Sequence, residues 1–187
     1  MFKGQEIGGN LPNKICHMGI GRTFQIPRPI KRLSILENVV VAAYFGQNGK
    51  ESQAASFDSA KDALEMVGLP TDSGASISTL GAAGLKKLEL ARALATKPEL
   101  LLADESLGGL DNSEMDQAAD MLKRIRSEMG ITIIWVEHIM GVLMRVVDRV
   151  MVLDHGEKIS EGLPTQVAND PKVIEVYLGT DASDAQA

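Results

Sequence analysis

Apolar positions recur along the chain with two different spacings, which divide it into a helical part and a part of alternating strands and helices. Between residues 30 and 97, apolar residues recur every three or four positions, as on one face of a helix. After Pro98 come two short apolar runs, residues 100–103 and 131–136, separated by an amphipathic stretch. This pattern predicts an α/β protein in which a helical block precedes a βαβ unit with parallel strands.

Start and stop signals give the expected bounds of the helices. Ser34 and Glu37 have the spacing of a capping box, so a helix is expected to begin there. Gly68 is placed to close a second helix, and Gly130 to close the helix of the βαβ unit. The expected helices are residues 34–45, 57–67, 85–94 and 113–129, with a polar loop at 46–56.

Shorter elements are expected at both ends of the chain. Residues 2–7 are typical of a strand or hairpin arm, Pro12 of the first turn of a short helix, and residues 20–26 of a strand. Near the other end, residues 150–153 predict a strand, and His155-Gly156 a turn that leads into a hairpin. The polar residues 181–187 predict a disordered tail.

Composition and charge narrow the class of protein. A chain of 187 residues, 44% of them hydrophobic, can bury one sizeable core, so one compact domain is expected. The net charge is −6 and basic residues are scattered, so we expect no nucleic-acid partner. The single Cys16 forms no internal disulfide, and no apolar run approaches the roughly 20 residues that cross a bilayer. Without a signal-peptide pattern at its start, the chain is expected to be a soluble cytoplasmic protein.

The strongest local signal for chemistry is a pair of carboxylates, Asp104 and Glu105, directly after the apolar run 100–103. The carboxyl edge of an open parallel sheet is where such folds bind ligands. In phosphoryl-transfer proteins, one carboxylate at this place holds Mg²⁺ and the next orients or deprotonates a water. A buried strand that merely ends in two solvated acids has the same pattern, so the pair alone does not decide between these interpretations.

A histidine in the next strand strengthens the first interpretation. The run 131–136 ends in Glu137 and His138, and parallel strands place their carboxyl ends at the same edge. An imidazole there can reach a ligand of Asp104 and stabilise a terminal phosphate. A single histidine more often forms a structural hydrogen bond. In its order and spacing after Asp104, however, His138 resembles the switch histidine of ABC ATPases.

Further motifs extend this resemblance over almost the whole chain, to the ATP-binding subunits of ABC importers of the branched-chain amino acid type. Residues 21–25, Gly-Arg-Thr-Phe-Gln, resemble the entry to the Q-loop, and residues 135–138, Trp-Val-Glu-His, resemble the switch. The other segments that resemble the family are residues 36–39, 89–94, 156–159, 161–164 and 176–179. Chance agreement at so many ordered positions is remote.

The resemblance implies a P-loop NTPase fold of the ABC ATPase type, truncated in this chain, over residues 1–180, with a helical subdomain over about 30–97. It implies ATP and Mg²⁺ as cofactors, with Asp104 and Gln25 at the metal, Glu105 as the base for water, and Gln25 and His138 as sensors of the γ-phosphate. The implied partners are a second ATP-binding subunit and membrane permease subunits. The implied location is the cytoplasmic face of the cell membrane, as a peripheral protein.

The sequence departs from the family at the phosphates of ATP. A loop of the form G-x-x-x-x-G-K-[ST] is expected well before Gln25, but only 24 residues precede Gln25 and none of them forms it. That loop supplies backbone N–H groups, a lysine and a hydroxyl to the nucleotide. At roughly 1.5–3 kcal/mol for each hydrogen bond to a charged group, losing about four weakens binding roughly ten-thousand-fold or more. We therefore expect this chain alone to bind ATP poorly.

The motif that grips the partner subunit's nucleotide is also altered. Residues 80–84 are Leu-Gly-Ala-Ala-Gly where the family has L-S-G-G-Q or L-A-Y-G-Q. The implied contacts come from Gly81, Ala82, Ala83 and Gly84, without the serine hydroxyl and with an added Cβ at Ala83. An ordinary glycine-rich helix start is the competing interpretation. Asp111 stands where the family contacts its partner, and an N-cap of the following helix is an equally good interpretation.

Two functional hypotheses follow. In the first, the chain is an incomplete ABC ATPase subunit; in the second, it is a non-catalytic interaction module that keeps the docking surfaces and has lost hydrolysis. A DNA-repair ATPase of related fold would need a long heptad insertion and a basic face, and neither is present. In the family, a central strand lies between the strands that match residues 131–136 and 150–153. We expect these two strands to be left with unpaired inner edges.

Overall fold

The computed structural model describes residues 1–47, 51–105 and 110–178, which fall into two compact units divided between His138 and Ile139. The expected tail at 181–187 lies outside the described residues. Among the described residues, no helix combines the length and the apolar character needed to span a membrane.

A three-stranded parallel sheet organises the first unit. Its strands are β1 (Ile20–Arg22), β2 (Leu100–Asp104) and β3 (Thr132–Val136), in the order β1-β2-β3. The helix α5 (Asn112–Met129) connects β2 to β3. The predicted βαβ unit with parallel strands is therefore confirmed, and the carboxyl ends of the three strands meet at one edge of the sheet.

The two faces of this sheet differ in burial. Leu101 and Ala103 are buried, and Ile133 and Trp135 pack against the main hydrophobic core. On the opposite face, Ile134 is 52% exposed although it lies in a strand. The face that bears Leu101 and Ala103 is therefore the one that packs against the core of the first unit.

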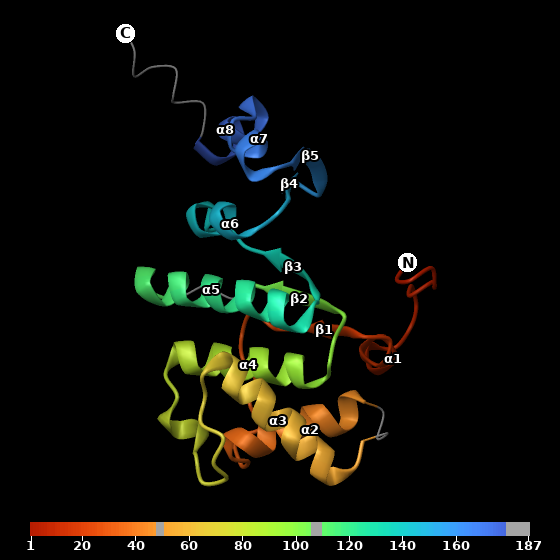
Figure 1. Ribbon diagram of the computed structural model, residues 1–187. Coiled ribbons are helices and arrows are strands. Elements are labelled where there is room, and N and C mark those ends of the chain that lie inside the picture. Colours follow the sequence, from red (N-terminus) through yellow and green to blue (C-terminus); the bar gives the residue numbers. More distant parts are fainter. Residues whose placement is uncertain (48–50, 106–109, 179–187) are drawn as a thin grey trace. The chain divides into compact units, whose positions relative to one another are not determined.

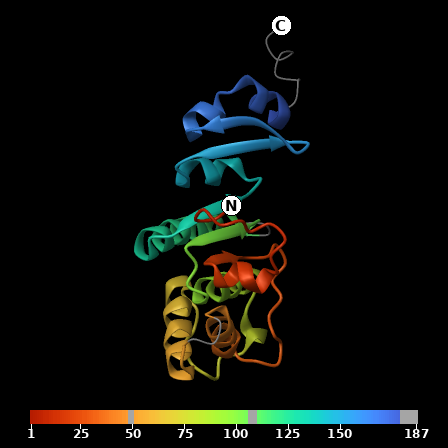
Figure 2. The same ribbon diagram turned by 90° about the vertical axis from the view of Figure 1, so that its right-hand side faces the viewer.

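The helical block consists of α2 (Ile35–Gly46), α3 (Gln53–Val67) and α4 (Ala82–Ala95), which pack against one another on one side of the sheet (Figures 1 and 2). A short 3₁₀ helix, η1 (Ile77–Thr79), precedes α4. Each helix contributes buried aliphatic side chains to one core, among them Ile35, Leu64 and Leu94. The apolar spacing seen in the sequence is thus explained by burial of one face of α2 and of α3, whereas α4 is buried on nearly all sides over residues 88–95.

Local signals in the sequence form the predicted caps. The Ser34 hydroxyl accepts from Glu37 N at 3.2 Å, and Ser34 N donates to the Glu37 carboxylate at 2.7 Å, which completes the capping box. Gly68 and Gly130 close α3 and α5 in the left-handed conformation, with φ of 69° and 64°. Glycine adopts this conformation without the steric cost of a Cβ.

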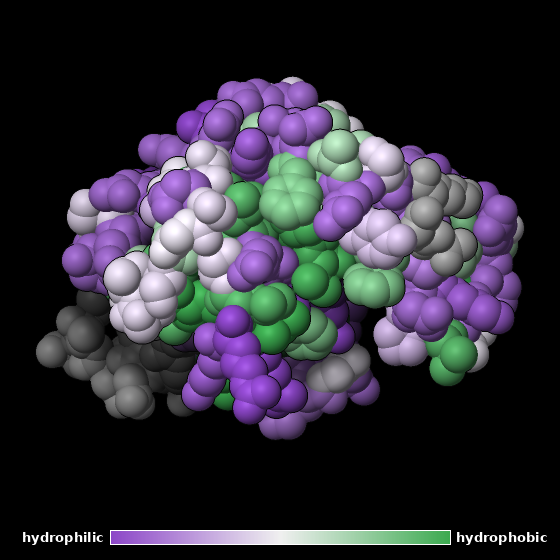
Figure 3. All heavy atoms as spheres, turned by 90° about the horizontal axis from the view of Figure 1, so that it is seen from below, coloured by the Kyte–Doolittle hydropathy of each residue, from purple (hydrophilic) through white to green (hydrophobic). Residues whose placement is uncertain are grey.

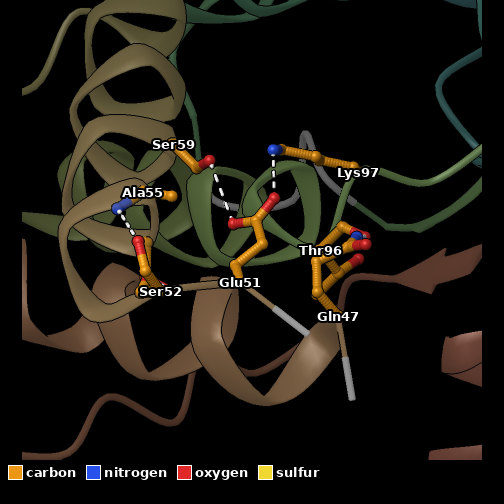
Figure 4. Close-up of polar contacts among 8 residues, drawn as sticks. Gln47, Glu51, Ser52, Ala55, Ser59, Thr96 and Lys97 are labelled. Carbon is orange, nitrogen blue, oxygen red and sulfur yellow. Dashed lines mark hydrogen bonds and ion pairs between the residues drawn. The ribbon is translucent and has the colours of Figure 1, made fainter. Parts of the chain in front are cut away.

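Polar contacts tie the ends of the three helices together (Figure 4). The Glu51 carboxylate, just before α3, accepts hydrogen bonds from Lys97 and from Ser59. The Gln47 amide donates to the Thr96 carbonyl at 2.7 Å. Residues that follow α2 and α4 are therefore joined, and the start of α3 is held against the end of α4.

A buried asparagine shapes the segment that leads into α2. Asn38 is 0% exposed, and its Oδ1 accepts from Ile30 N at 2.8 Å. Its amide nitrogen donates to the carbonyls of Ser34 at 2.9 Å, Ile30 at 3.2 Å and Leu33 at 3.4 Å. One side chain thus fixes the backbone of residues 30–34.

Several expected bounds were wrong. Residues 2–7 form an isolated bridge between Phe2 and Gln5 in place of a strand. The strand expected over 20–26 ends at Arg22, before Pro27 and Pro29. The loop expected at 46–56 ends earlier, because the Ser52 hydroxyl accepts from Ala55 N and caps α3 there. The helix expected from residue 85 begins at Ala82, and Pro12 begins α1 (Pro12–His17) as predicted.

The second unit is built around an antiparallel hairpin of β4 (Val150–Asp154) and β5 (Glu157–Gly162). The helices α6 (Met140–Val146), α7 (Pro164–Ala168) and α8 (Pro171–Leu178) belong to the same unit and were not predicted. In the part of the chain that the structure describes, β3 pairs only with β2 and β4 only with β5. The strands expected to have unpaired inner edges are therefore not paired with each other.

Candidate functional site

Asp104 is the last residue of β2 and is held from the neighbouring strand. Its carboxylate accepts from Arg22 Nη2 at 3.0 Å, and Arg22 is the last residue of β1. Its backbone N–H donates to the Thr23 hydroxyl at 3.1 Å, while Thr23 N donates to the Leu102 carbonyl at 3.0 Å. The exit of β1 therefore positions both the backbone and the side chain of Asp104.

Glu105 follows β2 in an uncommon conformation, with φ of 42°. Its N–H donates to the Val136 carbonyl at 3.0 Å, and its own carbonyl accepts from Lys86 Nζ at 2.8 Å. The amide of Gln25 donates to its carboxylate. Two residues that are 80 positions apart in sequence, and that the sequence analysis placed in one site, are thus in contact.

The end of β3 supplies a buried acid and an exposed histidine. The Glu137 side chain is 0% exposed, whereas that of His138 is 65% exposed. His138 Nδ1 lies 3.9 Å from the Glu137 carboxylate, and its backbone N–H donates to the same carboxylate at 3.3 Å. The described contacts of His138 are with Glu137, and none joins it to Asp104 or Glu105.

Lys86 is an additional cation at this edge of the sheet. It comes from α4, and burial lowers the pKa of its ammonium group, while the negative charges of Glu137 and Glu105 act in the opposite direction. Sequence reasoning missed both Lys86 and Arg22, because each pairs with a strand end far away along the chain. The one signal in the sequence for these two contacts is that Lys86 and Arg22 are basic residues within elements that are otherwise largely apolar.

The residues expected to reach a partner's nucleotide lie at two helix starts. Gly81 is the N-cap of α4, and Ala82 to Gly84 form the first turn of that helix with no side-chain cap. Asp111 caps α5: its Oδ1 accepts from Glu114 N at 2.8 Å, and the Glu114 carboxylate accepts from Asp111 N at 3.0 Å. The N-cap interpretation of Asp111 is therefore confirmed.

A cavity of about 110 Å³ lies between α4, α5 and the exit of β1. Its lining includes Phe24, Lys86, Leu90 and Met121. Pockets for small ligands usually occupy about 300–1,000 Å³, so this cavity is too small for a nucleotide. The carboxyl edge of the sheet remains the better candidate site.

The acids of this edge fit a magnesium ion only in part. Among residues 1–47, 51–105 and 110–178, no group of three or more histidine, cysteine or acidic side chains could hold a metal. Magnesium, however, is usually bound through one or two carboxylates together with substrate phosphates. The Asp104 carboxylate, at the end of β2, has the chemistry of such a single protein ligand.

Comparisons with known proteins point to one family. Residues 2–108 match the ABC transporter family, and residues 157–183 match the branched-chain amino acid ATP-binding cassette transporter family. The chain is 32% identical to the high-affinity branched-chain amino acid transport ATP-binding protein BraF of Pseudomonas aeruginosa. That similarity covers 94% of this chain and 74% of BraF.

Solved structures agree in fold. The chain is similar to MJ1267, an ATP-binding cassette of an ABC transporter, with a TM-score of 0.80 and 27% identity over 94% of this chain and 75% of that one. It is also similar to MJ0796 in its dimeric post-hydrolysis state bound to ADP and Pi. Here the TM-score is 0.71 and the identity 26%, over 83% of this chain and 68% of that one.

Proposed function

The chain belongs to the ABC transporter family, and from this premise we propose that it is the ATP-binding subunit of an importer of branched-chain amino acids. The substrate class rests on the name of BraF and on the match of residues 157–183. The observation that carries the proposal is the contact between Gln25 and Glu105 beside Asp104. Gln25 and Glu105 are in contact, and Asp104, which directly precedes Glu105, completes a cluster of residues at the carboxyl edge of the sheet.

Each side chain of the cluster has a defined part in the proposed mechanism. Asp104 would hold the metal, and Glu105 would accept the proton of the attacking water. Gln25, already bonded to the Glu105 carboxylate, orients that water, and His138 senses the γ-phosphate. Magnesium, when bound with ATP, supplies positive charge to the phosphate oxygens. The Arg22 guanidinium holds Asp104 in place from β1.

A second ATP-binding subunit is the proposed partner in hydrolysis. The start of α4, where Gly81 and Ala82 are exposed, offers backbone N–H groups to an anion, as helix N-termini do. Asp111, besides capping α5, is placed to contact that partner. Support comes from MJ0796, which is dimeric in its post-hydrolysis state.

A non-catalytic interaction module remains the second candidate, because the 187 residues contain no G-x-x-x-x-G-K-[ST] loop. Without the donors of that loop, Glu105 has no held nucleotide on which to act. Residues 80–84 favour the same candidate, since Gly81 provides no hydroxyl. Both candidate functions keep the surfaces that contact a second subunit and a membrane permease. They differ in whether the protein hydrolyses ATP.

The membrane partner is proposed to dock on the segment between Gln25 and α2 and on the adjoining end of α2. Figure 3, seen from the side of the helical block, shows apolar side chains gathered near the centre with polar ones around them. In this part of the chain, Ile26 is 69% and Phe45 66% exposed, and Ile30 and Tyr44 are also exposed. Exposed apolar patches of this kind mark protein interaction sites. Docking on a permease would place the chain peripherally at the cytoplasmic face of the membrane.

Two experiments test these proposals. Phosphate release from MgATP is expected to be absent with the chain alone; turnover that disappears in Glu105→Gln would contradict this and favour the catalytic candidate outright. Photo-crosslinkers at residues 28–33 are expected to capture a permease subunit in membranes that contain one. A folded protein that yields no permease adduct from any of these positions would count against docking.

A further inference from the structure

A lysine on α4 reaches the proposed base from a different element of the fold. Lys86 lies in the second turn of α4, and its Nζ donates to the Glu105 backbone carbonyl at 2.8 Å in a partly buried position. The contact joins the helix that begins with the altered motif at residues 80–84 to the end of β2. No motif in the sequence assigns this role to Lys86.

The carbonyl that Lys86 contacts belongs to a residue in a costly conformation. Glu105 has φ of 42°, which brings the Cβ of an L-residue close to its own backbone. Such a conformation persists only where surrounding contacts hold it. Three contacts do so here: Glu105 N–H to Val136, the Gln25 amide to the carboxylate, and Lys86 to the carbonyl.

The Lys86 ammonium also faces negative charge from two strand ends. The Glu137 side chain is 0% exposed, and the charges of Glu137 and Glu105 both act on Lys86. A buried carboxylate requires a compensating cation or hydrogen bonds. Lys86 thus supplies positive charge to the end of β3 while it holds the backbone at the end of β2.

We propose that Lys86 is a positioning residue that fixes Glu105 in its left-handed conformation and couples the start of α4 to the proposed base. The inference rests on the proposed role of Glu105 in hydrolysis. A displacement of α4, such as a partner subunit would cause at residues 81–84, is then transmitted to the Glu105 backbone through one hydrogen bond. Hydrolysis would respond to the partner through α4.

The test uses the 187-residue protein without nucleotide, so that its outcome does not depend on ATP binding. Lys86→Met is expected to move the Glu105 Cα and Cβ chemical shifts away from left-handed values. It should also speed hydrogen exchange at Glu105 N–H about tenfold, which corresponds to about 1.4 kcal/mol. Lys86→Arg, which keeps the charge and donors, should restore most of both signals. The matched control is Lys87→Met, one position along the same helix, which should leave Glu105 unchanged.

A second variant covers the case in which Lys86→Met fails to fold because Glu137 loses its compensating charge. Lys86→Met combined with Glu137→Gln removes that buried charge and still removes the hydrogen bond to Glu105. The proposal is overturned if the Glu105 shifts and exchange rate in this folded double variant equal those of Glu137→Gln alone. Failure of the proposed function would instead appear in nucleotide assays, which this experiment does not involve.

Discussion

Removal of the Asn38 side chain tests how the segment between Gln25 and α2 is held. Asn38→Ala deletes the acceptor for Ile30 N and the donor to three carbonyls, inside a site with no solvent exposure. The two short bonds, at 2.8 and 2.9 Å, contribute most. The lost bond to Ser34 contributes about 0.5–1.5 kcal/mol and the unsatisfied Ile30 N–H costs about 1–3 kcal/mol, so the expected loss is ~1.5–4.5 kcal/mol.

This loss of folding free energy can be measured by urea unfolding with Trp135 fluorescence as the signal. Trp135 is the single tryptophan and packs against the core of the same unit. With a slope of about 2 kcal/mol per molar urea, the midpoint should fall by roughly 1–2 M. Asn13→Ala, at an exposed position of α1, is the control and should change stability by less than about 0.5 kcal/mol. An Asn38→Ala midpoint equal to that of the control would refute the account of this segment.

Three further outcomes are expected. Ser34→Ala should cost about 1 kcal/mol in urea unfolding. Hydrogen bonds from Ser34 lower the pKa of the Glu37 carboxyl group. Their contribution to folding stability is therefore complete above the ordinary carboxyl pKa and is lost as the pH falls through the lowered pKa. Ser34→Ala removes only the share of the hydroxyl, because the Ser34 N–H still donates to the Glu37 carboxylate. The gap between wild type and variant should narrow in acid by that share, and a constant gap would mean that the hydroxyl does not stabilise the Glu37 carboxylate. A double-mutant cycle of Arg22→Gln and Asp104→Asn should give a coupling of about 0.2–1 kcal/mol, since both side chains are partly exposed; zero coupling would mean that the ion pair does not form. Leu64→Ala, at a fully buried position of α3, should cost about 2–5 kcal/mol by thermal or urea unfolding, and a loss below about 1 kcal/mol would place Leu64 outside the core.

Local signals in the sequence were sufficient for much of the fold. Ser34 and Glu37 formed the predicted capping box, and Gly130 closed the predicted helix. Apolar runs located β2 and β3 to within one residue. These features depend on residues close in sequence, and for that reason pattern alone could find them. The start of α3 was not predicted, because the composition of residues 46–56 is typical of a loop although Ser52 within it is an N-cap.

The sequence located part of the candidate site at strand ends, whereas it did not reveal the contacts that long side chains make there. The apolar run 100–103 placed Asp104 and Glu105 at a strand end, the resemblance to the Q-loop assigned Gln25 to the same site, and the structure shows Gln25 in contact with Glu105. Arg22 and Lys86 reach that cluster through flexible side chains, whose direction no periodicity specifies. Their contacts depend on the packing of α4 and β1 against β2, which is a property of the folded chain and not of any local pattern.

We propose that Gln25, Asp104 and Glu105 belong to an ATP site whose phosphates are held by a loop of the form G-x-x-x-x-G-K-[ST]. A direct test compares MgATP binding by calorimetry in two proteins: the 187 residues alone, and the same residues preceded by a segment that contains a G-x-x-x-x-G-K-[ST] loop. The account predicts no measurable binding by the first, and binding by the second that Asp104→Asn makes independent of magnesium. Equal affinity in the two proteins, or an unchanged magnesium requirement in Asp104→Asn, would contradict it.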